Sequence, residues 1–168
     1  KIFPIENPVE SDEFSCQKLG LQWQWQANPQ PTWLFTDAVK GLLKLYTSKL
    51  PDGARNLWEV PNVLMQKFPA DEFQATTKLT CKPNLKLEGE RTGLVVMGKD
   101  YASLNIKTKK AGLFLCFTVC KDADKGKEEQ ESEIVKLSTG IVYLRVKVFP
   151  GAKCKFSYSE DGKSFIDI

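Results

Sequence analysis

Alternating apolar and polar residues recur along this chain of 168 residues and restrict its fold more than any other feature. Val142, Leu144, Val146 and Val148 alternate with tyrosine, arginine and lysine. The segment 72–82 repeats this pattern with apolar and polar or charged residues. Because successive side chains of a β-strand point to opposite faces, each segment predicts a strand with one buried and one exposed face.

Further strand-like runs follow at regular intervals, separated by short turn signals. Residues 91–97 and 113–119 are apolar on both faces, as expected for strands at the centre of a covered sheet. Asp161-Gly162 lies between two strand-like runs and predicts a hairpin. With no sustained helical period, the sequence predicts an all-β fold, an antiparallel β-sandwich or jelly roll. Shorter strands are expected at 32–36, 42–47, 60–66, 101–107, 134–137, 154–159 and 164–168, with turns at 98–100, 110–112, 138–140 and 150–151.

The chain contains no histidine, and this excludes several kinds of site. Ser-His-Asp and Cys-His nucleophile systems, histidine zinc sites and imidazole acid–base catalysis all require that residue. The net charge is only +3, and lysine and arginine are scattered, so no nucleic-acid-binding surface is indicated. The longest apolar run, residues 113–120, is far shorter than the ~20 residues of a membrane-spanning helix. We expect neither nucleic acid nor a membrane as a partner.

Five cysteines, an odd number, leave at least one thiol without a disulfide partner. Cys116 and Cys120 share a face of one expected strand but lie ~13 Å apart along it, too far for a disulfide. No Cys-x-x-Cys pair is present. The sequence therefore favours buried free thiols that pack as small hydrophobic side chains. We expect no metal and no cofactor.

The segment LGLQWQWQANP, residues 19–29, places two tryptophans two positions apart. At strand spacing Leu21, Trp23 and Trp25 share one face, and three glutamines share the other. Such a row forms either part of a core or a surface that stacks on a sugar ring, and the neighbouring leucine favours the core. A sugar-binding face would combine several aromatic rings with converging polar groups, for which the possible carbohydrate contacts are Trp23, Trp25, Trp33, Tyr101 and Arg91.

Three segments interrupt the strand pattern. Residues 1–11 are rich in proline and glutamate and are expected to form a linker from an upstream domain. Residues 122–133 are highly charged, and a solvated hairpin tip is favoured there over a calcium site. Residues 49–62 contain glycine and proline but also Leu57 and Trp58, which a purely solvated loop has no reason to carry.

Several motifs, taken in their order along the chain, resemble a known domain. This resemblance covers residues 12–168 and points to the C-terminal β-sandwich of glycoside hydrolase family 43, the β-xylosidase and α-L-arabinofuranosidase group. The motifs are LGLQWQWQANP, TWLF, GLLKLYT, GARNLWEVPNVLMQKFP, ERTGLVVMGKDYASLNI, VYLRVKV and FSYSEDGKSF.

The resemblance implies a concanavalin A-like jelly roll that follows a five-bladed β-propeller, which carries the catalytic residues. It also implies that a loop of the sandwich reaches the propeller and places an aromatic or apolar side chain at the rim of the sugar pocket. The matching segment here is 54–62, with Trp58 as the expected side chain and Arg55, Asn56 and Leu57 beside it. Family members usually continue with two more strands, so we expect a truncation of the sandwich at its C-terminus.

The resulting prediction is a non-catalytic accessory β-sandwich of a glycosidase acting on xylan- or arabinan-type polysaccharides. Its expected partners are the propeller of the same polypeptide and a xylo- or arabino-oligosaccharide. A freestanding carbohydrate-binding module is the alternative. Catalysis by this chain itself would need a pair of carboxylates, such as Glu88 with Glu90 or Glu160 with Asp161, and solubilising surface charge is the simpler interpretation of both. We expect an extracellular or periplasmic location, although five cysteines without evident pairing also fit the cytoplasm.

Overall fold

The computed structural model describes residues 11–84 and 86–168, which divide into two compact units. The first unit contains residues 11–48 and 61–70, and the second contains residues 49–60 and 71–168. The linker predicted at 1–11 lies, except for its last residue, outside the described residues.

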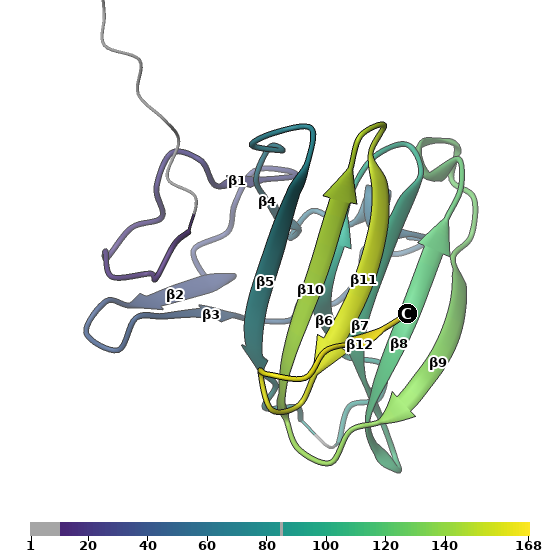
Figure 1. Cartoon of the computed structure of the whole chain (residues 1–168). Helices are drawn as coiled ribbons and strands as arrows, with labels where there is room; N and C mark the ends of the chain where they lie inside the picture. Colours follow the sequence, from purple (N-terminus) through teal and green to yellow (C-terminus); the bar gives the residue numbers. More distant parts are fainter. Residues whose placement is uncertain (1–10, 85) are drawn as a thin grey trace, which may run out of the picture. The chain divides into compact units, whose positions relative to one another are not determined.

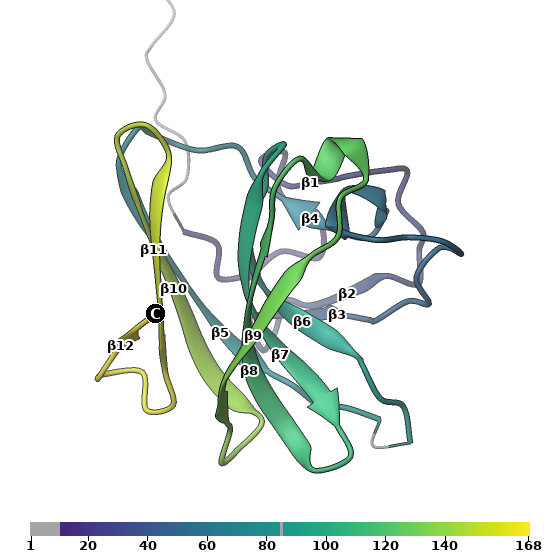
Figure 2. The same cartoon turned by 90° about the vertical axis from the view of Figure 1, so that its right-hand side faces the viewer.

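The second unit is an antiparallel β-sandwich of two four-stranded sheets, which confirms the predicted all-β class (Figures 1 and 2). One sheet has the strand order β12-β11-β10-β5, and the other has the order β6-β7-β8-β9. The chain forms β5 in the first sheet, all of the second sheet, and then the rest of the first. The bounds are β5 Phe73–Thr80, β6 Arg91–Val96, β7 Tyr101–Lys109, β8 Gly112–Cys120, β9 Gln130–Lys136, β10 Ile141–Phe149, β11 Lys153–Ser159 and β12 Ile166–Asp167.

The core of the sandwich lies between the two sheets and follows the alternation seen in the sequence. Val142, Leu144, Val146 and Val148 of β10 are each at most 2% exposed, whereas Lys147 between them is exposed. They pack in one cluster with inward-facing residues of the facing sheet, of β11 and of the position after β9: Leu104, Ile106, Leu115, Leu137, Phe156 and Tyr158. Burying such side chains contributes about 1.5–3 kcal/mol each, so this layer is the main source of stability.

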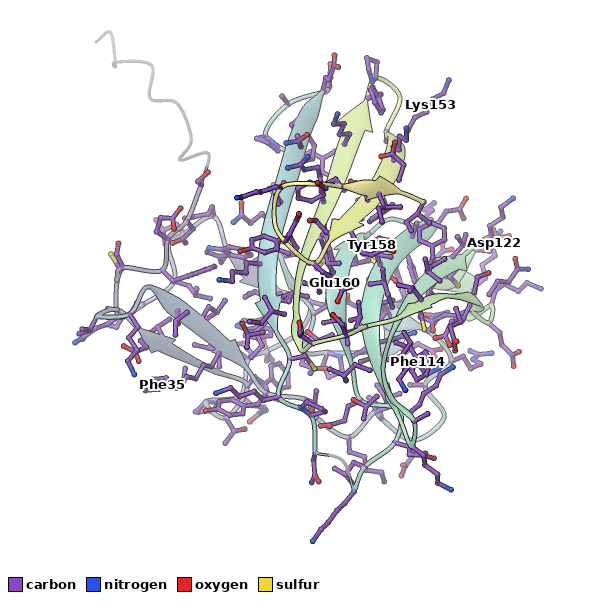
Figure 3. The ribbon with its side chains drawn as sticks, turned by 60° about the horizontal axis from the view of Figure 1, so that its bottom comes forward. Phe35, Phe114, Asp122, Lys153, Tyr158 and Glu160 are labelled. Atoms are coloured by element: carbon purple, nitrogen blue, oxygen red, sulfur yellow. The ribbon has the colours of Figure 1, made fainter. Side chains whose placement is uncertain are left out.

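Most predicted turns join neighbouring strands of one sheet. The turns at 98–100, 110–112, 150–151 and 161–162 lie between strands that pair directly with one another. The turn at 138–140 differs, because it leads from β9 in one sheet to β10 in the other. Lys153 and Glu160 mark the two ends of β11 in Figure 3.

Two strand expectations for the sandwich need correction. Residues 91–97 were expected at the centre of a sheet, but β6 is an edge strand. Part of its outer face is covered instead by local packing, since Val95, and Met97 just beyond the strand, pack against the cluster of Tyr101, Cys120 and Ala123. Residues 130–133 belong to β9 and not to a solvated hairpin tip, because Glu131 and Glu133 project toward lysines of β7.

The first unit contains two short antiparallel pairs: β1 (Gln24–Trp25) with β4 (Leu64–Met65), and β2 (Leu34–Asp37) with β3 (Leu42–Leu45). Within the segment 19–26, which was predicted to be a strand, only Gln24–Trp25 is one. The backbone turns before that point, where Trp23 N donates to Gly20 O at 3.1 Å. Leu21 is therefore fully exposed, while Trp23 and Trp25 are half-buried.

Helical structure among the described residues consists of two 3₁₀ turns, η1 (Leu57–Glu59) and η2 (Ala123–Lys125). No helix in this part of the chain is long and apolar enough to cross a membrane. The thiols of Cys116 and Cys120 are buried as predicted, and burial raises the pKa of both, so they stay protonated. Cys16, in contrast, is exposed.

The hairpin between β11 and β12 yields a prediction about pH. Asp161 accepts hydrogen bonds from Ser159 Oγ at 2.7 Å, Lys163 N at 2.7 Å and Ser164 N at 2.8 Å. These bonds lower the pKa of Asp161 to about 2. Because the folded-state pKa lies below the unfolded value, the stabilisation is complete above about pH 4 and is lost as the pH falls toward 2.

Asp161→Asn is therefore expected to reduce the free energy of unfolding at about pH 6, and to reduce it much less at about pH 2.5. Urea unfolding at both pH values measures this difference, with Asp71→Asn at an exposed position as the matched control. An equal effect of Asp161→Asn at both pH values would contradict the role of its carboxylate.

Candidate functional site

The candidate site is the loop of residues 54–60, here called the η1 loop, which belongs to the second unit and carries Trp58. Asn56 caps the 3₁₀ turn, because its Oδ1 accepts a hydrogen bond from Trp58 N at 2.9 Å. Glu59 closes the loop by accepting from Arg55 N at 2.6 Å and Arg55 Nη2 at 3.0 Å. These bonds to the backbone and then the side chain of Arg55 lower the pKa of Glu59.

Asn56 also fastens the η1 loop to the segment that follows β8. Its Nδ2 donates to Ala123 O at 3.0 Å and to Lys127 O at 2.7 Å, and the residue is only 4% exposed. Figure 2 shows the two 3₁₀ turns, η1 in blue and η2 in green, next to each other. Asn56 therefore uses both ends of its amide, one to cap its own turn and one to hold two carbonyls of a distant segment.

Gly126 allows this contact to form. Its φ is +69°, in the left-handed region that favours glycine, and a Cβ added there would lie 2.0 Å from Arg55 Nη2. Asp122, at the start of the same segment, is labelled in Figure 3. Gly126 thus provides both the backbone turn and the space that Arg55 occupies.

Tyr101 supports the η1 loop from the sheet side. Its hydroxyl accepts from Leu57 N at 2.9 Å and donates to Glu129 Oε1. Arg91 holds the same carboxylate in a bidentate pair with distances of 2.6 and 2.9 Å. Burial, and then the hydrogen bond to Glu129, raise the pKa of Tyr101 far above its usual range, so the phenol remains a donor. We call Arg91, Tyr101 and Glu129 the Tyr101 network.

Two residues expected as possible carbohydrate contacts thus have other roles in this structure. Tyr101 is 3% exposed and packs against Cys120, Ala123 and Leu57, so its ring has no open face on which a sugar could stack. The two Nη atoms of Arg91 are both used by Glu129. Carbohydrate contact by these two residues stays a prediction, whereas the contacts that the structure shows for Tyr101 support the η1 loop.

The four residues expected at the sugar-pocket rim are divided by the loop into two pairs. Asn56 and Leu57 point inward, where Asn56 is buried and Leu57 packs against the Tyr101 cluster. Arg55 and Trp58 reach the surface, with the Arg55 side chain 52% and Trp58 42% exposed. The arrangement fixes the backbone through several hydrogen bonds and leaves the Trp58 side chain partly exposed.

The three tryptophans proposed for sugar stacking belong to the first unit. Trp25 packs against Trp33 with ring centroids 5.3 Å apart and planes at 59°, and Trp33 is only 9% exposed. Trp23 packs against Phe14, and its Nε1 donates to Asp12 at 2.7 Å. The pair of Trp25 and Trp33 therefore does not form a flat, coplanar platform.

Comparison with known proteins identifies the family. A protein-family model described as the β-xylosidase C-terminal concanavalin A-like domain matches residues 11–168. The chain belongs to this family. It is 36% identical over 104 residues to a putative β-xylosidase of Xylanibacter ruminicola, which covers 61% of the chain and 18% of that protein. It is 43% identical over 49 residues to a β-xylosidase of Formosa agariphila, covering 29% of the chain and 8% of that protein.

Solved structures agree with the fold of this C-terminal domain. A bifunctional GH43-CE protein of Bacteroides eggerthii matches 94% of the chain and 20% of its own chain, with a TM-score of 0.74 and 23% identity. A second neighbour is a GH43 glycoside hydrolase engineered to display both endo-xylanase and exo-arabinofuranosidase activity. It matches 96% of the chain and 34% of its own, with a TM-score of 0.71 and 17% identity. The chain therefore spans about a third or less of these relatives.

Glu129 is the supporting residue that sequence reasoning missed in the GH43 domain. The signal was present: Glu129, Glu131 and Glu133 recur with the period of a strand, as do Lys107 and Lys109. In the structure these acidic residues pair with Arg91, Lys107 and Lys109, respectively. Two matching rows of opposite charge indicate strands that share one face of a sheet, but here β8 lies between β7 and β9, and which residues pair depends on the sheet register.

The contacts of Asn56 predict a loss of stability on substitution. Asn56→Ala removes the cap of η1 and leaves Ala123 O and Lys127 O without that donor, so we expect a loss of about 1–3 kcal/mol in the free energy of unfolding. Asn84→Ala is the control, because Asn84 is exposed and its Oδ1 accepts one local bond from Lys86 N. The free energy of unfolding of both variants is measured by urea unfolding. Equal losses for Asn56→Ala and Asn84→Ala would contradict the special role of Asn56.

Proposed function

We propose that this GH43 C-terminal domain is a non-catalytic accessory β-sandwich that docks on the catalytic β-propeller of the same polypeptide and helps to shape its sugar pocket. The observation that carries the proposal is the η1 loop. Asn56 and Tyr101 anchor the backbone of this loop through hydrogen bonds. Trp58, which directly follows the anchored residues, is 42% exposed. An indole can stack on a pyranose ring and also pack in an interface between domains.

The length of the relatives supports a role within a larger polypeptide. The matched GH43 structures are three to five times longer than the part that this chain covers, with 34% and 20% coverage. A domain used in this way needs a surface that meets its neighbour. Trp58 fits that use because tryptophan is enriched among the residues that dominate interface binding energy.

Xylan- or arabinan-type oligosaccharides are the substrate class that we propose for the complete enzyme. The supporting observations are the names of the relatives, a β-xylosidase and a putative β-xylosidase. The engineered GH43 neighbour displays endo-xylanase and exo-arabinofuranosidase activity. In this proposal the choice of sugar is made in the propeller, and the accessory domain contributes to closing the pocket.

The carboxylate pairs considered for catalysis have structural partners in the sandwich. Glu88 accepts from Lys110 N at 2.9 Å, and Glu90 accepts from Asn84 N at 2.9 Å. Glu160 accepts from Ser138 N at 3.0 Å, and Asp161 holds its own turn. Carboxylates that accept backbone hydrogen bonds in turns are suited to fixing those turns, and this supports a non-catalytic role.

The chain alone is expected to release no measurable product from aryl β-xylosides or aryl α-L-arabinofuranosides. The measurement is a chromogenic assay on the 168-residue chain, purified to homogeneity, with the full-length enzyme as the positive control. Turnover that remains with the chain through successive purification steps and is abolished by substituting Glu88 or Glu160 would overturn the non-catalytic assignment.

Trp58→Ala in the full-length enzyme is expected to raise KM several-fold or to lower the melting temperature of the assembled enzyme, because the indole contact with the propeller is lost. The isolated chain with the same substitution should remain folded by circular dichroism, since Trp58 is partly exposed. Phe149→Ala is the matched control, as Phe149 is an aromatic residue of the same unit with 37% exposure.

The kinetic constants and melting curves of both variants are compared with those of the unmodified enzyme. If Trp58→Ala leaves KM, kcat and the melting profile unchanged, the docking role of Trp58 is contradicted. An equal effect of Phe149→Ala would also count against it, because the effect would then not be specific to the η1 loop.

A further inference from the structure

We propose that Tyr101, oriented by Glu129 and Arg91, is a positioning residue that fixes the backbone at Leu57 and so sets the direction of the neighbouring Trp58 indole. This inference deepens the proposed function, on which the importance of Trp58 rests. The assignment differs from the expectation of direct sugar contact by Tyr101 and Arg91.

The backbone amide of Leu57 finds its acceptor outside the η1 turn. Leu57 is the first residue of η1, and the first N–H groups of a helical turn have no acceptor within that turn. The acceptor here is the Tyr101 hydroxyl at 2.9 Å. Because Leu57 packs against the cluster around Tyr101, its amide has a fixed partner in a largely buried setting. Removing the hydroxyl would therefore leave the donor without this partner.

The Tyr101 hydroxyl donates in one direction and accepts in the other. An ionised carboxylate only accepts hydrogen bonds, so the Tyr101 hydroxyl must give its single proton to Glu129. This leaves an oxygen lone pair for Leu57 N. Arg91 holds the Glu129 carboxylate in one orientation through two hydrogen bonds.

The backbone directly before Trp58 is held at two consecutive residues. The Leu57 amide is held by Tyr101, and the Asn56 side chain is held by Ala123 O and Lys127 O. These two anchors lie on the two residues that directly precede Trp58. The network therefore connects β6, β7 and the segment before β9 to the backbone from which the indole projects.

Fluorine NMR of the 168-residue chain labelled with 5-fluorotryptophan tests the inference directly. The chain has four tryptophans, and Trp58→Phe assigns the Trp58 resonance. Tyr101→Phe removes the acceptor for Leu57 N. Glu129→Gln keeps the size but presents an amide NH₂ that competes as a donor to the Tyr101 hydroxyl. Both variants are expected to shift or broaden the Trp58 resonance and to leave the other three in place.

Tyr143→Phe, a tyrosine of β10 in the opposite sheet, is the matched control and should not move the Trp58 resonance. If neither Tyr101→Phe nor Glu129→Gln changes that resonance, the positioning role is overturned. A shift of all four resonances would also overturn it, because the network would then support the fold in general. Two variants are used so that poor folding of one leaves the other to decide.

Kinetics of the full-length enzyme separate this inference from the proposed function. Tyr101→Phe is expected to raise KM by about 2- to 10-fold, the range for losing the neutral hydrogen bond to Leu57 N that positions the loop, with little change in kcat. Added to Trp58→Ala it should have almost no further effect, because both act through the same side chain. If the Trp58 resonance shifts but KM is unchanged, the positioning role of Tyr101 is supported and the proposed contribution of Trp58 to the sugar pocket is contradicted. A raised KM with an unmoved resonance would overturn the positioning role.

Discussion

The apolar layer between the two four-stranded sheets is the constraint on which the site depends. Leu104, Leu115 and Leu144 are fully buried in it and fix how the strands of the sandwich face one another. Only because β6, β7 and β9 are held in register can Arg91 and Glu129 meet over the outer face of their sheet. The η1 loop is thus stabilised by polar contacts whose geometry comes from the hydrophobic core.

The loop itself uses buried hydrogen bonds in place of a regular secondary-structure ladder. A 3₁₀ turn of three residues has little stability of its own, and its end groups need partners outside the turn. Asn56 supplies one partner from the adjacent cap position, and Tyr101 supplies another from 44 residues away in the sequence. Asn56 also ties the turn to carbonyls 67 and 71 residues away. A surface that is fixed before contact loses less conformational entropy on docking, which suits the proposed contact of this loop with another domain.

The sequence predicted the sandwich well because its strands follow the simple period of two. The alternation of β10 and the Asp161-Gly162 hairpin appear in the structure where the residues place them. The same rule failed at Leu21, because a backbone turn at Gly20 interrupts the strand and removes the alternation. The alternation of apolar and polar residues predicts which face of a sheet a side chain occupies only where the backbone is extended.

For the candidate site, the sequence located the loop but not what holds it. Trp58 stood out as a large aromatic residue in a loop, a feature that is visible without knowledge of contacts. The role of Tyr101 depends on the register of three strands and on an acceptor for Leu57 N, and neither can be read from spacing. Membership of the GH43 C-terminal family adds the context in which a partly exposed, firmly held indole has a use.

A crystal structure of the full-length enzyme with a bound xylo- or arabino-oligosaccharide tests the central claim most directly. The account predicts that the Trp58 indole is buried against the catalytic domain at the mouth of its sugar pocket, with the Leu57 N to Tyr101 hydroxyl bond intact. A structure in which Trp58 remains in solvent, away from the catalytic domain and the bound sugar, would contradict it.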